Sequence, residues 1–335
     1  MGASEENTPR VLRFDEFVEL ALYHPEHGYY RRGRPRVGYG AGTDFLTATA
    51  SAPLFGRLVA EACRQLLGGA KPSDGGGAAD AGSFRFVEIG AEPAKSPAPP
   101  FPFASHTQVQ VGEPIALSGK CIVFSNELFD AQPFRRFRRR AGAWRELGVK
   151  LEVEVPTQGA VEVEIDPVSA PRPRFSDAPL PSSLPESAPE GYVIDAPTGA
   201  AALAARIAAQ PWTGLFVAFD YGKSWEEIAH HTPEGTARAY RRHVQSNDLL
   251  AHPGDQDLTC HVCWDWIADA LREHGFQEPV LESQERFFTR HAGDFISATI
   301  AAQGARFSRD KLSILQLLHP ANMGQNFQVL WAKRG

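Results

Sequence analysis

Polar side chains follow the apolar run 121–124, in which a buried strand is expected. Asn126 and Glu127 come directly after this run, and Asp130 follows shortly afterwards. Carboxylates and amides at such a position can bind a ligand, because α/β sheets bind ligands at the carboxyl ends of their strands. These three residues are therefore candidates for an active site. The structural alternative is that Asp130 caps a helix beginning near Ala131 and that Glu127 pairs with a local arginine.

Two further apolar runs end in residues of the same kind. Asp220 and Tyr221 follow one of them, and Glu88 and Gly90 close the other. A core position with a hydrogen-bonded hydroxyl is the alternative role for Tyr221. If the three strands share one parallel sheet, their polar ends meet at the same edge. The sequence thus predicts one cleft built from three strand ends.

The elements that must position these residues alternate along the chain. Apolar residues at helical spacing predict helices at 13–24, 51–67, 198–210 and 263–276. Buried strands are expected at 84–90, 107–111, 121–124, 214–222 and 326–333, and alternating antiparallel strands at 144–155 and 160–165. This order predicts an α/β fold with a doubly wound sheet and extra antiparallel strands.

The chain divides by composition into three parts. Residues 1–67 form a helical segment that carries the loop GTDFLTA, residues 68–83 form a flexible linker, and residues 84–335 form the α/β core. Within the core, we expect an inserted lobe at about 223–262 and an irregular, proline-rich excursion at 167–191.

Charge and hydropathy exclude several classes of function. The formal net charge of −6 argues against a nucleic-acid binder, which needs a basic face. The arginine-rich run 135–140 is expected to be a solvated strand edge, with an anion or partner contact as the alternative. No apolar stretch is long enough to span a membrane, and the first residues do not form a secretory signal. We therefore expect a cytoplasmic protein that binds neither nucleic acid nor membrane, and a homodimer stays open.

The cysteines do not indicate a disulfide framework or a metal centre. The chain has four, at 63, 121, 260 and 263, which fits a reducing compartment. The stretch CHVC has the spacing of a metal-binding pair, but a zinc site needs four ligands and no second pair lies nearby. We expect these cysteines to be structural.

Eight motifs occur in the order of one known family. They are ALYHPEHGYY (21–30), GTDFLTA (42–48), VEIGA (87–91), NELFDAQP (126–133), FDYG (219–222), GTARAYRRH (235–243), HPGDQDLTCHV (252–262) and MGQNFQVL (323–330). With them the chain resembles, nearly end to end, the MidA-type family of class I S-adenosylmethionine-dependent methyltransferases, which includes mitochondrial complex I assembly factors. The resemblance implies a class I methyltransferase-like, Rossmann-like sheet with an added helical lobe, and S-adenosyl-L-methionine as the cofactor.

The resemblance also implies methyl transfer to a protein, because the assembly-factor members methylate an arginine on a subunit of the respiratory NADH dehydrogenase. On this basis, Glu127 and Asp130 would contact the guanidinium, with which carboxylates pair bidentately. Asn126 would orient the substrate through its amide. Tyr221 would line the methyl-acceptor pocket, with Asp220 beside it.

The cofactor side is assigned in the same way. Glu88 and Gly90 belong to the family's cofactor loop. The GTDFLTA motif lies at the cofactor cleft in the family, so the resemblance nominates Asp44, Phe45 and Thr47.

The cofactor loop departs from the family pattern. The family reads roughly V-E-x-G-x-G-x-G, and here Gly90 remains while Glu92 and Ala94 replace the next two glycines. Glycine lets the backbone approach a ligand closely, whereas a Glu side chain adds bulk and negative charge. Prolines between 93 and 100 oppose the helix that should follow.

The interval from Gly90 to Asn126 is short for the two strands and crossover helices that the class I pattern places there, since one βαβ unit takes about 30 residues or more. We therefore expect the first crossover helix and the second strand to be missing. The acid that holds the ribose would be lost with that strand, and Glu113 is the nearest replacement.

Three functions stay open on this sequence. The first is a working protein methyltransferase with a remodelled cofactor loop. The second is an inactive homologue that acts as a protein-binding or assembly module, which would explain intact acceptor-side motifs beside eroded cofactor-side motifs. The third is an enzyme of another class that uses the same cleft.

Overall fold

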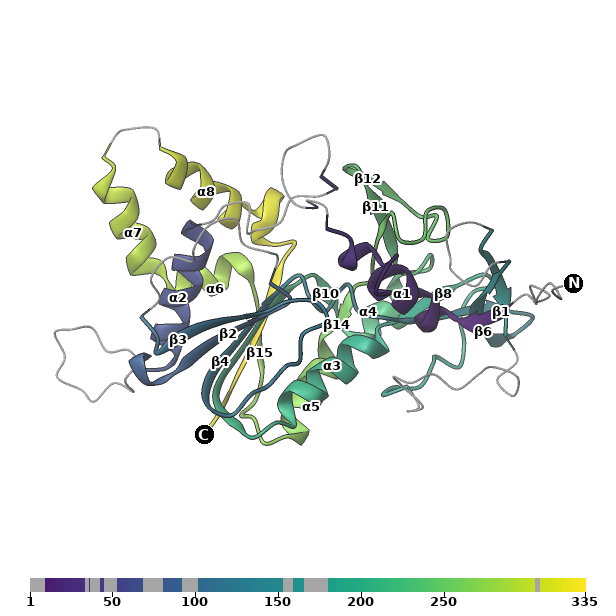
Figure 1. The fold of residues 1–335 in the computed structure, drawn as a ribbon, viewed down its shortest axis with the longest axis horizontal. Coiled ribbons are helices and arrows are strands. Elements are labelled where there is room, and N and C mark those ends of the chain that lie inside the picture. Colours follow the sequence, from purple (N-terminus) through teal and green to yellow (C-terminus); the bar gives the residue numbers. More distant parts are fainter. Residues whose placement is uncertain are drawn as a thin grey trace, which may run out of the picture. The chain divides into compact units, whose positions relative to one another are not determined.

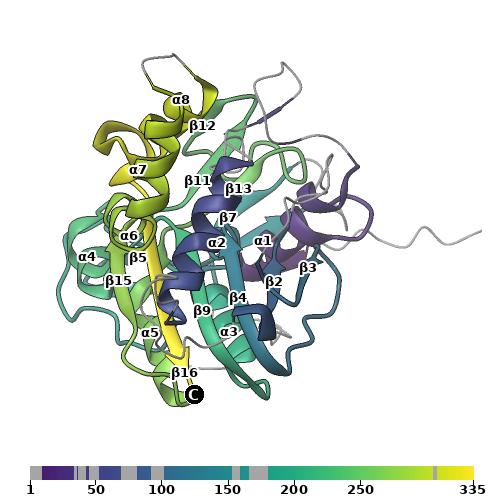
Figure 2. The ribbon, with the colours of Figure 1, turned by 90° about the vertical axis from the view of Figure 1, so that its left-hand side faces the viewer.

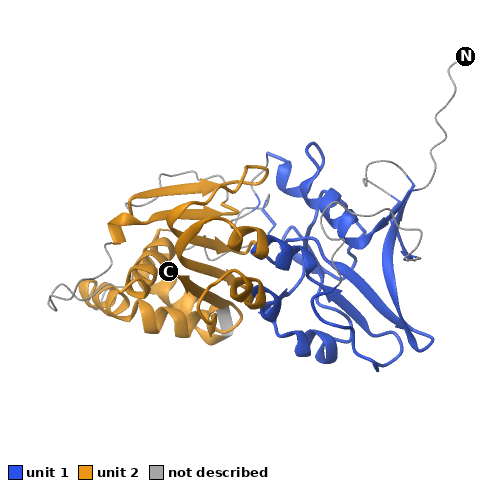
Figure 3. Ribbon diagram, turned by 90° about the horizontal axis from the view of Figure 1, so that it is seen from below, with its two compact units in different colours: residues 1–45, 129–204, 222–267 blue, residues 46–128, 205–221, 268–335 orange. Residues whose placement is uncertain are grey.

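The computed structural model describes residues 10–33, 36, 43–44, 53–68, 81–91, 102–152, 159–165, 180–304 and 308–335. Contacts within the chain divide it into two compact units, each assembled from three separate stretches (Figure 3). Unit 1 comprises residues 1–45, 129–204 and 222–267, and unit 2 comprises residues 46–128, 205–221 and 268–335.

Unit 2 is built on a six-stranded sheet in the order β15-β16-β9-β4-β2-β3 (Figure 1). Its strands are β2 (Arg85–Ile89), β3 (Ser105–Val109), β4 (Gly119–Asn126), β9 (Trp212–Asp220), β15 (Val280–Ser283) and β16 (Gln328–Arg334). The first four are parallel, and β16 and β15 add antiparallel to β9. The predicted α/β sheet is thereby confirmed.

Four helices cover one face of this sheet (Figure 2). They are α2 (Leu54–Leu66), α6 (Gln284–His291), α7 (Gly293–Ala302) and α8 (Arg309–Leu318). Phe55 of α2 packs against the rings of Phe124, Phe219 and Phe288, with centroids 5.6–6.4 Å apart. The predicted helix 51–67 is confirmed as α2, although it begins at Leu54. The helices α6, α7 and α8 were not predicted from the sequence; they lie between β15 and β16 in the chain and add a helical layer.

The structure describes one strand between β2 and β4, where the class I pattern has two. This confirms the expected shortening among the described residues. However, β3 pairs in parallel register with β2, Arg85 opposite Ser105 and Ile89 opposite Val109. The position next to β2 in the sheet is therefore occupied by β3. The expectation that the second strand of the class I pattern, which lies at this position, is missing needs correction. The altered loop positions Glu92 and Ala94 lie outside the described residues.

Unit 1 contains a five-stranded antiparallel sheet, which confirms the extra antiparallel strands. The strands β1 (Arg10–Arg13), β6 (Ala143–Leu151), β5 (Arg135–Arg140) and β8 (Val193–Ala196) are neighbours in that order, and β7 (Val161–Glu164) pairs with β6. Helix α1 (Phe14–Tyr23) contributes Phe14, Phe17 and Leu22 to the core beside this sheet.

The arginine-rich run forms β5, and most of its guanidinium groups are paired with carboxylates. The pairs are Arg135–Glu146, Arg136–Asp195, Arg138–Glu162 and Arg140–Glu164, with N···O distances of 2.6–2.8 Å. The run is thus a strand, as expected, but its charges are neutralised within the fold rather than only by solvent.

The remaining elements are short. They are α3 (Thr198–Ala208), α4 (Trp225–His231), α5 (Trp264–Glu273), β10 (Gly222–Lys223), β11 (Arg238–Arg241), β12 (Val244–Ser246), β13 (Asp257–Thr259) and β14 (Val262–Cys263). Helices α3 and α5 confirm the sequence prediction, and Gly275, with φ of +79°, follows α5 as expected. No helix begins near Ala131, so Asp130 is not a helix cap. Within the described ranges, no helix is both long and apolar enough to cross a membrane.

Candidate active site

The carboxyl ends of β2, β4 and β9 lie side by side in unit 2. Asn126 is opposite Phe219 in the register, and Gly90 and Asp220 end their strands at the same edge. The chain leaves β2 toward β3 on one side and leaves β4 toward β9 on the other, so the strand order reverses between β2 and β4. Open α/β sheets bind ligands at such a switch point.

Gly90 occupies a position that only glycine fits. Its φ is +80°, and a Cβ atom there would lie 2.8 Å from Cδ1 of Leu128. Its N–H donates to the carbonyl of Val109 at 2.9 Å, which fixes the turn against β3. Because Gly90 is exposed and carries no side chain, its main chain is open to a ligand at the switch point.

Asn126 and Glu127 form a hydrogen-bonded pair at the end of β4. The Asn126 amide donates from Nδ2 to Oε1 of Glu127 at 3.0 Å. The other amide atom, Oδ1, is buried and accepts no hydrogen bond from any residue that the structure describes. The same holds for the hydroxyl of Ser125. A buried acceptor without a donor is costly, so a ligand N–H at Oδ1 would be stabilising.

The backbone of Glu127 is strained. Its φ is +51°, in the left-handed region that residues other than glycine rarely adopt. The N–H of Glu127 donates to the carbonyl of Phe219 at 2.9 Å, and this bond to β9 holds the turn in place. Such strain costs about 1 kcal/mol or more and concentrates at functional sites. The turn directs the Glu127 carboxylate toward Asn126.

Asp220 and Tyr221 end β9 beside this pair. Asp220 is fully buried, and its Oδ1 accepts the N–H of Tyr221 at 2.9 Å. The ring of Tyr221 is half-buried and meets Phe327 edge to face, with centroids 5.4 Å apart. The structure therefore brings both residues to the predicted edge, and the contacts of Asp220 are those of a residue that shapes the turn.

The Glu88 carboxylate forms hydrogen bonds with side chains of the neighbouring strand β3. Its Oε2 accepts hydrogen bonds from Nε2 of Gln108 at 2.9 Å and from the His106 ring at 3.1 Å. It lies two residues before Gly90 on β2, and it ties β2 to β3 below the edge.

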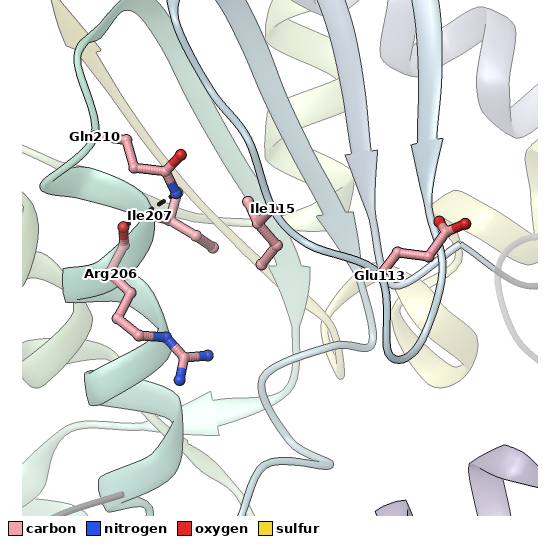
Figure 4. Close-up of a pocket in the computed structure, with 5 residues that line it drawn as sticks. All are labelled: Glu113, Ile115, Arg206, Ile207 and Gln210. Atoms are coloured by element: carbon pink, nitrogen blue, oxygen red, sulfur yellow. Dashed lines mark hydrogen bonds between the residues drawn. The ribbon is translucent and has the colours of Figure 1, made fainter. Parts of the chain in front are cut away.

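A cavity of about 260 Å³ lies beside the segment that follows β3. It is lined by Glu113 and Ile115 from that segment and by Arg206, Ile207 and Gln210 from the end of α3 (Figure 4). None of the strand-end residues lines it. Glu113 is the residue that we expected to hold the ribose of the cofactor. Its Oε2 accepts a hydrogen bond from the N–H of Gln110 at 2.7 Å.

Of the other predicted residues, Asp130 and Asp44 belong to unit 1. Asp130 is 3% exposed and lies near Asp257, which is 4% exposed. Burial, and then the negative charge of Asp130, raise the pKa of Asp257 to about 7. The hydroxyl of Tyr30 donates to Oδ1 of Asp257 at 2.9 Å, and the ring of Tyr30 stacks on that of Tyr23. Asp130 is therefore one of two buried carboxyl groups rather than a member of the strand-end pair.

Asp44 has both carboxylate oxygens occupied within unit 1. Oδ2 accepts the hydroxyl of Tyr29, and Oδ1 accepts the N–H of Arg242, each at 2.8 Å. Phe45 and Thr47, the other residues of that motif nominated for the cofactor cleft, lie outside the described residues.

Two features were not predicted from the sequence. The predicted strand 121–124 ends before Ser125, whereas β4 extends to Asn126 and buries the Ser125 hydroxyl. Asp257 begins β13 and is buried, which the motif HPGDQDLT did not indicate. The apolar residues that follow Asp257 were the available sign of a buried strand.

Comparison with known proteins identifies the family of this chain. The family model described as "Putative S-adenosyl-L-methionine-dependent methyltransferase" matches residues 103–280, more than half of the chain. A zebrafish (Danio rerio) protein named "Protein arginine methyltransferase NDUFAF7, mitochondrial" is 27% identical over 214 residues. That match covers 63% of this chain and 46% of the relative, so the chain spans about half the length of that relative.

Two crystal structures of Burkholderia thailandensis proteins share the fold. One, bound to S-adenosyl-homocysteine, has a TM-score of 0.74 and 24% identity, covering 97% of this chain and 88% of the other. The second, a native structure, has a TM-score of 0.72 and 22% identity, covering 97% and 87%. The strand order, the glycine turn at the switch point and the family match lead to one conclusion: this chain belongs to the family of S-adenosyl-L-methionine-dependent methyltransferases.

Proposed function

We propose that the protein transfers the methyl group of S-adenosyl-L-methionine to a guanidinium nitrogen of an arginine in a protein substrate. The observation that carries this proposal is the acceptor pair at the end of β4, where Asn126 Oδ1 is buried without a donor among the described residues and lies next to the Glu127 carboxylate. Guanidinium is planar and presents several N–H groups, so it can donate to both residues at once. The name of the zebrafish relative supports the same acceptor.

The residues at the switch point fit the cofactor. Gly90 has an exposed main chain and no room for a Cβ atom, which suits a close approach of the ligand. Glu113, in the turn after the strand beside β2, is the carboxylate available to the ribose hydroxyls. When bound, S-adenosyl-L-methionine supplies an electrophilic methyl group on a sulfonium.

The chain's own residues would position the acceptor. The Glu127 carboxylate would accept guanidinium N–H groups and take the proton that the nitrogen loses as its bond to carbon forms. Asn126 would fix the plane of the guanidinium through Oδ1. Tyr221, half-buried beside them, would close the pocket around the arginine side chain. Holding reactants in line lowers the barrier to such a displacement.

We propose, on the resemblance described above, that the substrate is a subunit of the respiratory NADH dehydrogenase. The acceptor motif NELFDA is intact in this chain, which supports a substrate shared with the family.

A second candidate function is a protein-binding or assembly module without methyl transfer. The observation in its favour is the shortened connection from β2 to β4, in which the described residues contain a single strand and no helix. Such a connection offers fewer backbone N–H groups to the carboxylate of the cofactor than a helix N-terminus does.

Titration calorimetry with S-adenosyl-L-methionine and S-adenosyl-homocysteine separates these functions. Methyl transfer requires binding, and we expect a Kd near the micromolar range, about −8 kcal/mol. Folded protein that binds neither ligand at millimolar concentration would exclude the transferase and leave the module.

Glu127→Gln tests the acceptor role. The substitution keeps an oxygen for the Asn126 amide and removes the charge, so we expect a loss of at least about 100-fold in transfer of labelled methyl groups to arginine-bearing protein, with cofactor binding unchanged. Glu273→Gln, at an exposed position of α5, is the matched control. Equal activity of the two variants would remove Glu127 from the site.

A further inference from the structure

The hairpin formed by β11 and β12 in unit 1 has an unusual turn. Arg242 and His243, the two residues between the strands, have φ of +52° and +63°. Tight two-residue hairpins place both residues in the left-handed region, and Asn and Gly are the usual choices there. An arginine and a histidine at these positions cost stability, and strain of this kind persists where a function maintains it.

The turn is held in place by Asp44. The Arg242 N–H donates to the side-chain Oδ1 of Asp44 at 2.8 Å. The His243 N–H donates to the backbone carbonyl oxygen of Asp44 at 2.9 Å. Thr43 Oγ1 lies 3.1 Å from the His243 ring. The contact of Arg242 with Asp44 uses its backbone N–H and not its guanidinium. The strained turn is therefore a fixed support for the side chains that it carries.

The hairpin is cationic and lacks internal counterions. Among the described residues, no carboxylate forms an ion pair with Arg241 or Arg242. Among the described residues of 29–52, to which Asp44 connects the turn, Asp44 is the only acid, against three arginines, of which Arg32 pairs with Asp255. The carboxylate of Asp44 already accepts the Tyr29 hydroxyl and the Arg242 N–H. A local excess of positive charge thus stands out in a chain whose net charge is −6.

The outer strand of the hairpin is an open edge. The three-stranded sheet has the order β12-β11-β13, and no other strand in the described part of the chain pairs with the free side of β12. All three residues of β12 are exposed, and Val244 is 64% exposed next to the basic turn. An edge of this kind can accept an extended peptide as an added strand. A nucleic-acid backbone lacks the alternating N–H donors and carbonyl acceptors that would match it.

We propose that the β11–β12 hairpin is a docking surface for an acidic, extended segment of a partner protein. Acidic side chains of the segment pair with Arg241 and Arg242, and its backbone pairs with β12. The surface lies in unit 1 and stands on the hairpin alone, so it does not depend on methyl transfer at the strand ends of unit 2.

Fluorescence anisotropy tests this proposal without cofactor. The probe is a labelled peptide of alternating Glu and Thr, about ten residues long, which is long enough to pair with a strand. We expect the full chain to bind it at low salt and to lose affinity as salt rises, because exposed charges are screened. A peptide in which Gln replaces Glu should bind at least about tenfold more weakly.

Two substitutions locate the contact. Arg242→Asn keeps the left-handed backbone and the N–H that Asp44 accepts, while Arg241→Gln lies in a regular strand. We expect each substitution to weaken binding of the Glu–Thr peptide several-fold, and the double variant to weaken it at least about tenfold. Arg309→Gln, an exposed arginine of unit 2, is the control with the same change of charge.

Three results would overturn the proposal. They are the failure of the wild-type chain to bind the Glu–Thr peptide, an equal loss of affinity in Arg309→Gln, and tighter binding of a labelled single-stranded RNA with the same dependence on Arg241 and Arg242. The last result would assign the surface to nucleic acid instead. Circular dichroism and the Tm of the Arg241→Gln variant confirm that the fold is intact when affinity is compared.

Discussion

Two buried titratable residues of unit 1 have pKa values shifted in opposite directions. Burial, together with Asp130, raises the pKa of Asp257 from 3.8 to about 7. Burial lowers the pKa of His261 from 6.5 to about 4, and the charge of Lys223 adds to this shift. Both side chains are therefore neutral in the folded protein between about pH 4 and pH 7. In the unfolded chain, both would be charged over much of this interval.

The two shifts make opposing contributions to stability. Folded Asp257 holds a proton that the unfolded chain has lost, so its contribution is full below about pH 4 and declines as the pH rises to about 7. In the folded protein His261 stays neutral at pH values where the unfolded chain binds a proton at this residue. Its contribution to the free energy of unfolding is therefore full above about pH 6.5 and declines as the pH falls to about 4. Each slope reaches at most about 1.4 kcal/mol per pH unit.

Asp257→Asn and His261→Gln should separate these slopes. Relative to wild type, Asp257→Asn should gain stability as the pH rises from about 4 to about 7, because only wild type loses the contribution of Asp257 over this range. His261→Gln should lose stability over the same interval. Urea unfolding at several pH values measures both differences. Parallel pH profiles for wild type and either variant would mean that the substituted residue keeps its ordinary pKa.

Glu92 is the residue to which the cofactor's affinity should respond most strongly. It replaces a glycine of the family's loop and brings a negative charge toward the carboxylate of the cofactor. Glu92→Gly should tighten S-adenosyl-homocysteine binding by about tenfold, which calorimetry would detect. Ala94→Gly is the control, since it restores a glycine without removing charge. No gain from either would place the weakness in the shortened connection to β3.

Residue types at strand ends were enough to find the edge, but not its geometry. The pattern of apolar run followed by Asn, Glu or Asp predicted that Asn126, Glu127, Asp220 and Gly90 share one edge, and they do. The positive φ of Glu127 was not predictable, because it depends on the bond from its N–H to Phe219 on another strand. Tertiary contacts of this kind have no signature in the local sequence.

At the scale of elements, the helical layer of unit 2 has an unusual origin. In the expected pattern, crossover helices after the first strands cover the sheet. Here the described connection between β2 and β3 has no helix, and α6, α7 and α8, inserted between β15 and β16, pack on the same face as α2. The apolar segments of α6, α7 and α8 are short, so the sequence did not indicate which face of the sheet these helices cover. Helices from another part of the chain therefore complete the core on this face of the sheet.

Arg334 joins the ends of two helices of unit 2 to the last strand. Its guanidinium donates at 2.5–3.1 Å to the carbonyl groups of Ala208 and Gln210 at the end of α3, of His274 just after α5 and of Trp212 at the start of β9. It also stacks on the ring of Phe276, 4.5 Å from the centroid. A single planar side chain thus satisfies carbonyl groups that helix ends leave without donors.

Arg334→Lys should destabilise the protein although it keeps the charge. A lysine ammonium cannot present donors in a planar fork, so several of these carbonyl groups would lose their partner. We expect a loss of about 2 kcal/mol in the free energy of unfolding, measured by urea titration. Arg309→Lys, on the exposed start of α8, should change stability little. A loss below about 0.5 kcal/mol for Arg334→Lys would show that water can satisfy the carbonyl groups in place of the guanidinium.

At the scale of the whole molecule, the two units have separate cores but share continuous helices. The boundary between them falls within α3, at 204/205, and within α5, at 267/268. Unfolding one unit therefore removes part of a helix from the other. Composition alone suggested consecutive segments, because nothing in a linear pattern marks where a chain passes from one core to the next.

We expect a single unfolding transition for both units. Phe17→Ala in the core of unit 1 and Phe288→Ala in that of unit 2 each delete a fully buried ring and should each cost about 3–5 kcal/mol. Because the units share helices, both substitutions should lower the same calorimetric transition. Two resolved transitions, each lowered by only one substitution, would show that the units unfold independently.

The position of β16 has a consequence for how the protein is made. This strand lies between β15 and β9, yet all other strands of the sheet precede it in the sequence. A growing chain can pair β2, β3, β4 and β9 during translation, but β15 has no neighbour in the sheet until β16 emerges from the ribosome. Its edge, and that of β9, stay exposed until then. Synthesis that stops before β16 should therefore yield a protein with an open sheet, which chaperones and proteases can distinguish from the folded one.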